Sequence, residues 1–361
     1  MTTAVSIDSV TKRFDATTAV DDVTIDIAKG EFFTLLGSSG CGKTTLLRII
    51  AGFLRQTAGT IRFDDKPIDD VPAHRRNTGM VFQNYAIFPH LSVFDNIAYG
   101  LRARRCAKAE VEARVGQMLE LIQLAALRHR RPRELSGGQQ QRVVLARAMV
   151  IQPDVLLMDE PLSNLDTAMR VHLRAEIRAL QRQVGITTIY VTHDQEEALL
   201  MSDRVAVMSH GRVEQIATPL EIYNAPETRF VAGFVGECNM LPGKVAEVLD
   251  GTATVALGEG GLLIVDGVSG VASGEARTVA FRPQDVELQP VPDDDMRGLC
   301  GRLADIQFLG GTVRFVVDIG AGAIVHVAAQ RRTGAAIPVL GGRYRLDIPA
   351  HTVRLFEPTP A

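Results

Sequence analysis

One short segment constrains this chain more than any other: a glycine-rich loop between a predicted strand and a predicted helix. The segment at residues 37–44 reads GSSGCGKT, which fits the pattern G-x-x-x-x-G-K-[ST]. An apolar run at residues 31–36 precedes it, and a helical stretch at residues 45–51 follows it. Glycines let successive backbone N–H groups turn inward, and the helix N-terminus adds the positive end of its dipole. The order strand, loop, helix therefore predicts a cradle for the phosphates of a nucleotide.

The side chains of this phosphate loop (residues 37–44) suit the same ligand. Lys43 supplies a positive charge to the β- and γ-phosphates, and the Thr44 hydroxyl is a hard oxygen ligand of the kind that Mg²⁺ prefers. We expect ATP to contact the whole loop and the start of the helix. The expected contacts are Gly37, Ser38, Ser39, Gly40, Cys41, Gly42, Lys43, Thr44 and Thr45.

A second apolar run, at residues 155–158 (VLLM), ends in the acidic pair Asp159 and Glu160. A continuous apolar run is typical of a buried parallel strand, and the carboxyl end of such a strand opens on the ligand crevice. Asp159 is expected to reach Mg²⁺ directly or through water, and Glu160 to polarise the attacking water beside the γ-phosphate. Because a phosphate loop lies upstream, we predict that this pair serves nucleotide hydrolysis.

The composition changes near residue 236. Before it, short apolar runs alternate with long helical stretches, which is typical of a mixed α/β domain. After it, β-branched runs such as residues 312–319 (TVRFVVDI) and 323–328 (AIVHVA) alternate with Gly, Pro and Asp turns, the pattern of a small β barrel or sandwich. We therefore predict two domains, at residues 1–236 and 237–361.

Charge, hydropathy and cysteine content argue against several classes of function. The 361 residues carry a formal net charge of −3, so no basic surplus indicates a nucleic-acid partner. The N-terminus has no apolar h-region, and no uninterrupted apolar run reaches about 18 residues, so we expect a chain that is neither secreted nor membrane-spanning. The 4 cysteines form no CxxC pair, which predicts free thiols in a reducing compartment.

Between the two nucleotide motifs stands a third, LSGGQ at residues 135–139, followed by a helical stretch at residues 140–150. With it, the chain resembles the ATP-binding-cassette (ABC) ATPases. The resemblance extends to a glutamine loop at Gln83, a D-loop at residues 163–166 (SNLD) and a switch histidine at His193, all in the order of the family. It implies an α/β P-loop NTPase fold with a parallel-sheet core and a helical subdomain at about residues 84–150, followed by a small all-β barrel domain.

The LSGGQ segment also has a physical reading of its own. Its serine and glycines at a helix start form another anion site of backbone N–H groups, although the chain already has one phosphate cradle. In the family, this second cradle holds the ATP of a partner cassette, so the resemblance implies a head-to-tail dimer of two copies. Asp166 of the D-loop would lie at their boundary. The signature residues are Leu135, Ser136, Gly137, Gly138 and Gln139.

The resemblance also assigns roles around the γ-phosphate. It implies Glu160, His193 and Gln83 as the catalytic set, with Glu160 as the base, and Thr44, Gln83 and Asp159 as the Mg²⁺ set. Phe14 stands where the family offers an aromatic ring, commonly tyrosine, on which adenine stacks; ordinary core packing is the alternative for this residue. Ser38 replaces a proline of many relatives, and we expect little effect because the glycines and Lys43 are intact.

The C-terminal region favours the importer branch of the family. Residues 230–239, 241–245 and 281–286 resemble the linker and the TOBE or OB-like regulatory extension of importers for polyamines, ferric iron, phosphonates and sugars. The segment at residues 84–100 is most similar to polyamine and ferric-iron importers. We therefore expect an ATP-hydrolysing import subunit, with a polyamine such as spermidine or putrescine as cargo and ferric iron or 2-aminoethylphosphonate as alternatives.

The resemblance implies partners as well. These are a second copy of the chain as a homodimer, two integral membrane permeases and, indirectly, a secreted or periplasmic solute-binding protein, with the chain peripheral on the cytoplasmic face of the inner membrane. Two other classes stay open: a soluble ABC ATPase acting on a nucleic-acid or ribosomal assembly, and an exporter cassette. The near-neutral charge, the lack of heptads and the C-terminal β-rich region argue against them.

Overall fold

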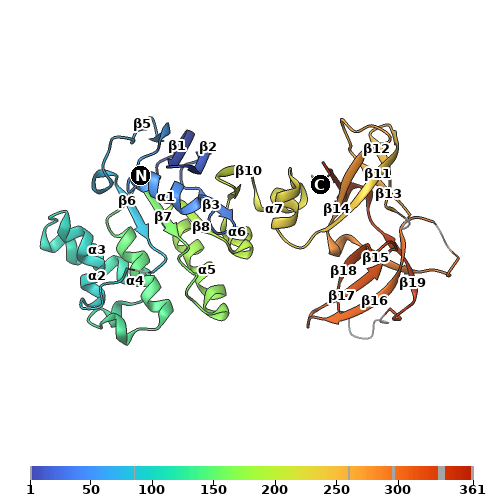
Figure 1. The fold of residues 1–361 in the computed structure, drawn as a ribbon. Helices are drawn as coiled ribbons and strands as arrows, with labels where there is room; N and C mark the ends of the chain where they lie inside the picture. Colours follow the sequence, from blue (N-terminus) through green and yellow to red (C-terminus); the bar gives the residue numbers. More distant parts are fainter. Residues whose placement is uncertain (1, 85, 259–260, 295–296, 332–337, 359–361) are drawn as a thin grey trace. The chain divides into compact units, whose positions relative to one another are not determined.

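The computed structural model describes residues 2–84, 86–258, 261–294, 297–331 and 338–358 (Figure 1). Tyr85, in the segment at residues 84–100 that supported the polyamine assignment, lies outside them. The chain divides into two compact units, Met1–Ala225 and Pro226–Ala361. The predicted boundary at 236 lies within the second unit, because the buried Arg282 donates Nη1 hydrogen bonds of 2.9 Å and 3.1 Å to the carbonyls of Ala232 and Glu237.

The first unit is built on a six-stranded sheet of order β10-β9-β3-β8-β7-β6, in which β10 alone is antiparallel to its neighbour. Parallel strands point the same way, so their carboxyl ends meet at one edge of the sheet. The strands are β3 (Phe32–Gly37), β6 (Thr78–Val81), β7 (Val155–Asp159), β8 (Thr187–Thr192), β9 (Arg204–Ser209) and β10 (Arg212–Ala217).

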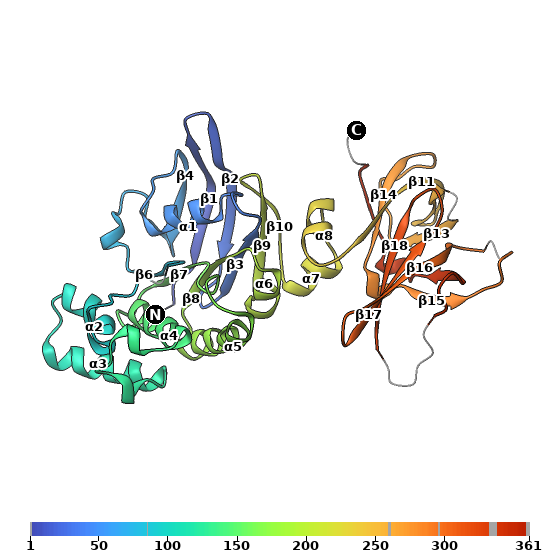
Figure 2. The same cartoon turned by 60° about the horizontal axis from the view of Figure 1, so that its bottom comes forward.

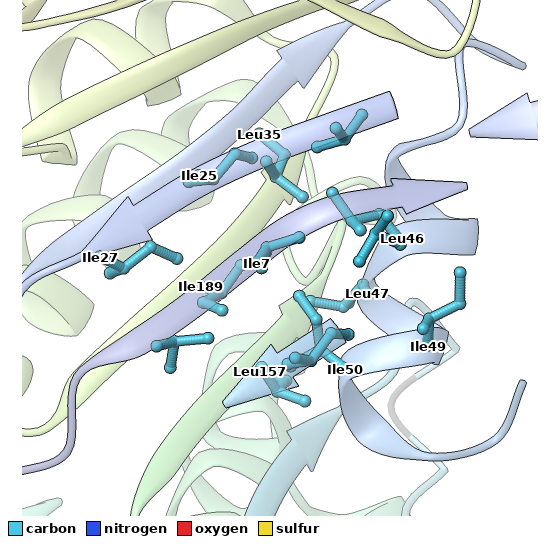
Figure 3. Close-up of a cluster of buried hydrophobic side chains, with 14 of the residues drawn as sticks. Ile7, Ile25, Ile27, Leu35, Leu46, Leu47, Ile49, Ile50, Leu157 and Ile189 are labelled. Carbon is cyan, nitrogen blue, oxygen red and sulfur yellow. The ribbon is translucent and has the colours of Figure 1, made fainter. Parts of the chain in front are cut away.

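An antiparallel sheet of order β2-β1-β4-β5 packs over α1 (Lys43–Ala51) on one side of this sheet. The core between them combines α1 side chains with alternate residues of the parallel strands, as Figure 3 shows for Leu46, Leu157 and Ile189. The antiparallel strands are β1 (Val5–Phe14), β2 (Thr17–Ile27), β4 (Ala58–Phe63) and β5 (Lys66–Pro67).

The other face of the parallel sheet is covered by α4 (Gly137–Met149) and α5 (Thr167–Val184) (Figure 2). In β7, Leu156 and Met158 belong to this second core, whereas Leu157 belongs to the first. A strand buried on both faces has no polar face, which is why its sequence is a continuous apolar run. The expected parallel-sheet core is therefore confirmed.

A third core joins α4 to α2 (Val93–Ala103) and α3 (Lys108–Leu121), which form the helical part of the first unit. Two short helices complete this unit, α6 (Gln195–Met201) and α7 (Pro219–Asn224). Short 3-10 turns occur in the described chain at Ala73–Arg75, Ala125–Leu127, Pro132–Glu134, Pro283–Asp285 and Ala350–Thr352.

The second unit begins with α8 (Arg229–Phe234) and continues as two antiparallel five-stranded sheets, of orders β13-β12-β11-β14-β20 and β15-β19-β16-β17-β18, around one shared core. The predicted all-β region is confirmed. Asn239 ties the sheets together by exchanging two 2.8 Å hydrogen bonds with the backbone of His326. The strands are β11 (Asn239–Leu249), β12 (Thr252–Ala256), β13 (Leu262–Asp266), β14 (Ala276–Phe281), β15 (Glu287–Pro290), β16 (Cys300–Phe308), β17 (Thr312–Asp318), β18 (Ile324–Gln330), β19 (Arg343–Asp347) and β20 (Arg354–Phe356).

Two further properties bear on the expectations from sequence. Within the described residues, no helix is long and apolar enough to cross a membrane. The 4 cysteines are free thiols, as predicted; Cys41 and Cys300 are buried, and Cys106 and Cys238 are partly buried.

Candidate functional site

The predicted site residues follow the carboxyl ends of neighbouring parallel strands. β3 leads into the phosphate loop, and β7 ends at Asp159 with Glu160 next. β8 precedes His193, and β6 precedes Gln83. Because β3, β8, β7 and β6 are consecutive in the sheet, these four motifs lie along one edge. The topology therefore brings together segments that the sequence separates widely.

Glycine is required at the turn of the phosphate loop into α1. Gly42 caps the helix with a φ of 103°, a left-handed conformation that side chains rarely adopt. A Cβ at Gly42 would lie 2.3 Å from the carbonyl oxygen of Ala19, and a Cβ at Gly37 would lie 2.4 Å from that of Met208. The loop is thus held in its shape from outside, by backbone on two sides.

The Lys43 side chain folds back over the phosphate loop to which it belongs. Its side-chain ammonium donates 2.8 Å hydrogen bonds to the carbonyls of Gly37 and Ser38, and the residue is only 4% exposed. In the described part of the chain, no carboxylate forms an ion pair with it. The ammonium also lies 3.6 Å from the Cys41 Sγ. A buried ammonium with only neutral partners suits an anion such as a phosphate, which would supply the missing counter-charge.

The oxygen pair next to the loop suits a hard cation. The Thr44 hydroxyl donates a 2.8 Å hydrogen bond to Oδ1 of Asp159, which joins the start of α1 to the end of β7. Burial raises the pKa of Asp159, partly opposed by the Thr44 hydrogen bond. No group of three or more His, Cys, Asp or Glu ligands occurs among the described residues, so a metal at this pair would take its other ligands from phosphate oxygens and water.

Glu160 is the residue on which three segments converge. Its carboxylate oxygen Oε2 lies 3.1 Å from Nδ1 of His193 and accepts a 3.5 Å hydrogen bond from Nε2 of Gln83. Its own backbone is left-handed, with φ 44°, and its N–H donates to the carbonyl of Val191 in β8. The three predicted catalytic side chains therefore meet at one carboxylate.

The D-loop is attached to the same place. Ser163 Oγ donates a 3.0 Å hydrogen bond to the carbonyl of Glu160, and Asn164 Nδ2 donates a 2.9 Å bond to the carbonyl of Gln83. Asp166 is exposed and caps α5 by accepting a hydrogen bond from the N–H of Met169. The role of Asn164 in tying Gln83 to the D-loop was missed, since nothing in its position in the sequence indicates the Gln83 carbonyl as its partner.

The signature residues lie at the start of α4 and contact a different region. Ser136 and Gln139 form a capping box, each accepting a hydrogen bond from the backbone of the other. A Cβ at Gly137 would lie 3.3 Å from the Leu165 side chain, so this glycine of the signature packs beside the D-loop. No hydrogen bond within the described chain joins residues 135–139 to the phosphate loop.

Phe14 stands at the end of β1. It is 43% exposed, and the Lys12 ammonium lies 4.8 Å from the centre of its ring. This exposure excludes the alternative of ordinary core packing for Phe14. The ring is available at the surface, as the adenine-stacking prediction requires, and the stacking itself stays a prediction.

Sequence reasoning also missed a group of arginines on α5. Arg170 and Arg174 both donate to Oδ2 of Asp194, the residue after His193, at 3.3 Å and 2.8 Å. Their spacing of four places them on one helix face, which is a signal that could have been read. Their carboxylate partner follows a different strand, and only the fold reveals it.

Comparison with known proteins agrees with this geometry. The family model described as ABC transporter matches residues 20–163, and that described as TOBE domain matches residues 279–356. The spermidine/putrescine import ATP-binding protein PotA of Thermobifida fusca is 45% identical over 319 residues, which are 87% of this chain and 83% of that protein. The protein of the same name from Aliivibrio fischeri is 44% identical over 90% of this chain and 87% of its own length.

Two solved structures match about three fifths of the chain. The structure of cbiO1 from Clostridium perfringens, part of the ABC transporter complex cbiONQ, has 32% identity and a TM-score of 0.57 over 60% of this chain and 89% of that chain. A dimeric ATP-binding cassette in a post-hydrolysis state, bound to ADP and phosphate, has 30% identity and a TM-score of 0.53 over 60% of this chain and 98% of that chain. The chain therefore belongs to the ABC transporter family, as an ATPase subunit that couples ATP hydrolysis to transport and carries a C-terminal TOBE domain.

Proposed function

We propose that this chain energises the import of spermidine, putrescine or a closely related polyamine. The observation that carries the proposal is the similarity to relatives named as spermidine/putrescine import proteins, which is 43% to 45% over about nine tenths of the chain. The similarity extends into the second unit, which a relationship of the ATPase unit alone would not produce. The chain would act on the cytoplasmic face of the inner membrane, bound to two permeases. A solute-binding protein would deliver the solute to these permeases.

In this proposal, ATP is held by the phosphate loop and the start of α1, at residues 37–45. Lys43 exchanges its two carbonyl partners for phosphate oxygens, which restores a counter-charge to the buried ammonium. Thr44 and Asp159 hold Mg²⁺, which when bound neutralises charge on the β- and γ-phosphates. Phe14 offers its exposed ring to adenine.

Glu160 is the proposed general base. His193 and Gln83 both contact Oε2 of its carboxylate, so two donors from neighbouring segments fix where the carboxylate points. A base must lie within hydrogen-bond reach of the proton that it removes, and this orientation keeps Glu160 directed toward the γ-phosphate position. His193 then holds both the carboxylate and the water in line with the phosphate.

A second copy of the chain completes the site. Within the described chain, no hydrogen bond joins residues 135–139 to the phosphate loop, and the dimeric cassette bound to ADP and phosphate supports a paired arrangement. The signature of one copy would close over the ATP held by the phosphate loop of the other. Asp166, exposed at the start of α5, would lie at this boundary.

The permease contact is proposed for the surface around Gln83. Aromatic side chains are exposed there: Phe53 is 55% exposed and Phe82 is 37% exposed, with ring centres 6.1 Å apart. Tyr99 of α2 is 51% exposed, and its ring centre lies 4.6 Å from that of Phe88, with the two rings tilted. Exposed aromatic rings are typical anchors of protein interfaces. The Asn164 bond to Gln83 would connect this surface to Glu160.

The test is ATP hydrolysis by the full complex in lipid vesicles. The chain is assembled with its two permeases and a binding protein, and spermidine, putrescine, ferric iron and 2-aminoethylphosphonate are supplied separately. We expect a several-fold stimulation by a polyamine and none by the other two solutes, and E160Q as the matched control abolishes the signal. Stimulation by ferric iron or 2-aminoethylphosphonate alone would contradict the polyamine assignment and identify that solute as the cargo. Activity unaffected by any solute but raised by a nucleic acid or ribosomes would contradict the importer.

A further inference from the structure

Behind His193 lies a cluster of charged and polar side chains that the proposed mechanism does not use. It joins α5 to the end of β8 and the start of α6. Its members are Arg170, Arg174, Tyr190, Thr192, Asp194, Glu196 and Glu197.

Asp194 is the most tightly held member of this cluster. Its Oδ2 accepts from Arg170 and Arg174, and its Oδ1 accepts a 3.2 Å hydrogen bond from the N–H of Glu197. Its own N–H donates a 3.0 Å bond to Oγ1 of Thr192. Because Thr192 and Asp194 flank His193, both backbone neighbours of the switch histidine are fixed by these contacts.

The inner half of the cluster is buried and built to stay in place. Glu197 is 3% exposed, and its Oε2 accepts 2.7 Å hydrogen bonds from Tyr190 and Thr192. Arg174, with 6% of its side chain exposed, bridges Asp194 and Glu196. Burial raises the pKa of Tyr190 well above its ordinary value, so its hydroxyl keeps the proton that it donates. This half forms a rigid base for His193.

Arg170 differs from the inner half of the cluster because it contacts two separate segments of the chain. One guanidinium nitrogen donates to Asp194 at 3.3 Å, and the other donates a 3.1 Å hydrogen bond to the carbonyl of Leu165 in the D-loop. Leu165 in turn packs beside Gly137 of the signature. A single planar guanidinium therefore links the segment that adjoins the signature to the residue that follows the switch histidine.

We propose that Arg170 is a positioning residue that transmits the position of the D-loop to His193 and, through it, to Glu160. The inference rests on the proposed function in one respect, namely that a second copy docks at the signature and the D-loop. Docking then fixes the Leu165 carbonyl and with it Arg170 and Asp194, so that His193 is held in its 3.1 Å contact with Glu160. Hydrolysis becomes dependent on the presence of the partner copy.

The competing reading is that Arg170 merely stabilises α5 through an ion pair. Arg178 provides a matched control, because it lies two turns further along the same helix and pairs with Asp203 and Gln181. Neither of these partners belongs to the D-loop or flanks His193. R178Q therefore removes an α5 ion pair without touching the proposed connection.

The experiment compares R170Q, R170K and R178Q with the unaltered full-length chain. Hydrolysis rates over a range of ATP concentrations give kcat, KM and the Hill coefficient, a fluorescent ATP analogue gives affinity, and thermal unfolding gives Tm. For R170Q we expect kcat to fall about 10-fold and the Hill coefficient to approach one, with affinity within about 2-fold, because the contact acts after binding. R178Q changes kcat and the Hill coefficient less than about 2-fold.

R170K sharpens the test. Lysine keeps the positive charge, but its compact ammonium lacks the planar fork that reaches two acceptors. We expect R170K to recover Tm but not kcat. Full activity in R170K, or equal kinetics in R170Q and R178Q, would overturn the proposal, as would a Hill coefficient of one in the unaltered chain. The assay uses ATP without any transported solute. Its result therefore does not depend on whether the polyamine assignment is correct.

Discussion

The two units of this chain are both rich in strands, and among the described residues the side chains of the predicted site gather in the first. In the first, β3, β8, β7 and β6 run parallel, so the residues after each strand meet at one edge. In the second, every described pairing is antiparallel, and consecutive strands end at opposite edges. The difference teaches that strand direction, rather than strand content, decides where chemistry can concentrate.

Several polar side chains of the second unit form structural contacts within that unit. Asn239 joins the two sheets, and Arg282 donates to the carbonyl of Ala232 in α8 and to that of Glu237 after it. Arg314 pairs with Glu237 across the same region. In the first unit, Thr44 and Asp159 instead share a hydrogen bond at the sheet edge, where a ligand can replace it. A donor and an acceptor that remain replaceable distinguish the site from a structural contact.

The largest expected effect separates binding from turnover within the first unit. K43A removes the ammonium that contacts ground-state phosphate, so ATP affinity falls about 100-fold or more. E160Q keeps the shape of the side chain but removes the base, so affinity changes little while hydrolysis falls at least about 100-fold. Nucleotide titration and single-turnover hydrolysis measure both quantities.

Equal ATP affinity of K43A and the unaltered chain would contradict the assignment of Lys43 to phosphate. An E160Q chain that hydrolyses ATP at the unaltered rate would move the base elsewhere.

A pair of core substitutions tests whether the units fold around separate cores. Leu303 is 1% exposed in the core of the second unit, and Leu157 is 0% exposed in that of the first. Each leucine-to-alanine change costs about 2–5 kcal/mol of unfolding free energy because it leaves a cavity. L303A should lower the unfolding transition of its own unit and leave ATP affinity within about 2-fold. L157A, beneath Asp159, should lower both stability and ATP affinity. Equal loss of ATP affinity in the two variants would show one cooperative core.

The pH dependence of stability offers a smaller effect, traced to Asp159. Its pKa is raised above 3.8 mainly by burial, so the folded chain holds this proton more tightly than the unfolded chain. The folded state is therefore favoured at low pH, and this contribution is lost as pH rises from about 3.8 through the folded pKa. Above the folded pKa the buried carboxylate is charged, and its desolvation costs stability.

D159N removes that charge and keeps an oxygen that can accept from Thr44. Without nucleotide, the variant should have a Tm equal to or above that of the unaltered chain at high pH, and the difference should shrink as the pH falls through the folded pKa of Asp159. Thermal unfolding in a pH series measures it. A difference that grows toward acid would mean that a favourable interaction, rather than desolvation, dominates at this carboxylate.

The smallest effect is expected at the surface, far from both kinds of contact. Arg55 and Asp70 form an ion pair of 2.8 Å whose side chains are 77% and 86% exposed. R55A should change the unfolding free energy by less than about 0.5 kcal/mol, because solvent screens such pairs. Denaturant unfolding measures the change, and a loss above 1 kcal/mol would indicate that the pair belongs to a larger network.

The sequence predicts the first unit better than the second, and the reason is physical. Glycine-loop chemistry and two-sided burial leave local patterns, so the phosphate loop and β7 can be read from short windows of residues. The contact of Arg170 with Asp194 spans 24 positions and depends on how α5 packs, which no local pattern reveals. The contact of Arg282 with the Ala232 carbonyl in α8 was likewise hidden, because it joins residues 50 positions apart.

The central claim is that two copies of this chain enclose ATP between a phosphate loop and a signature. Its most direct test is the mass of the E160Q chain in solution, measured by light scattering with and without saturating ATP and Mg²⁺, alone and with its permeases. The account predicts an ATP-dependent dimer, lost again in a chain that carries both K43A and E160Q. An E160Q chain that stays monomeric with bound ATP, whether its permeases are absent or present, would contradict it.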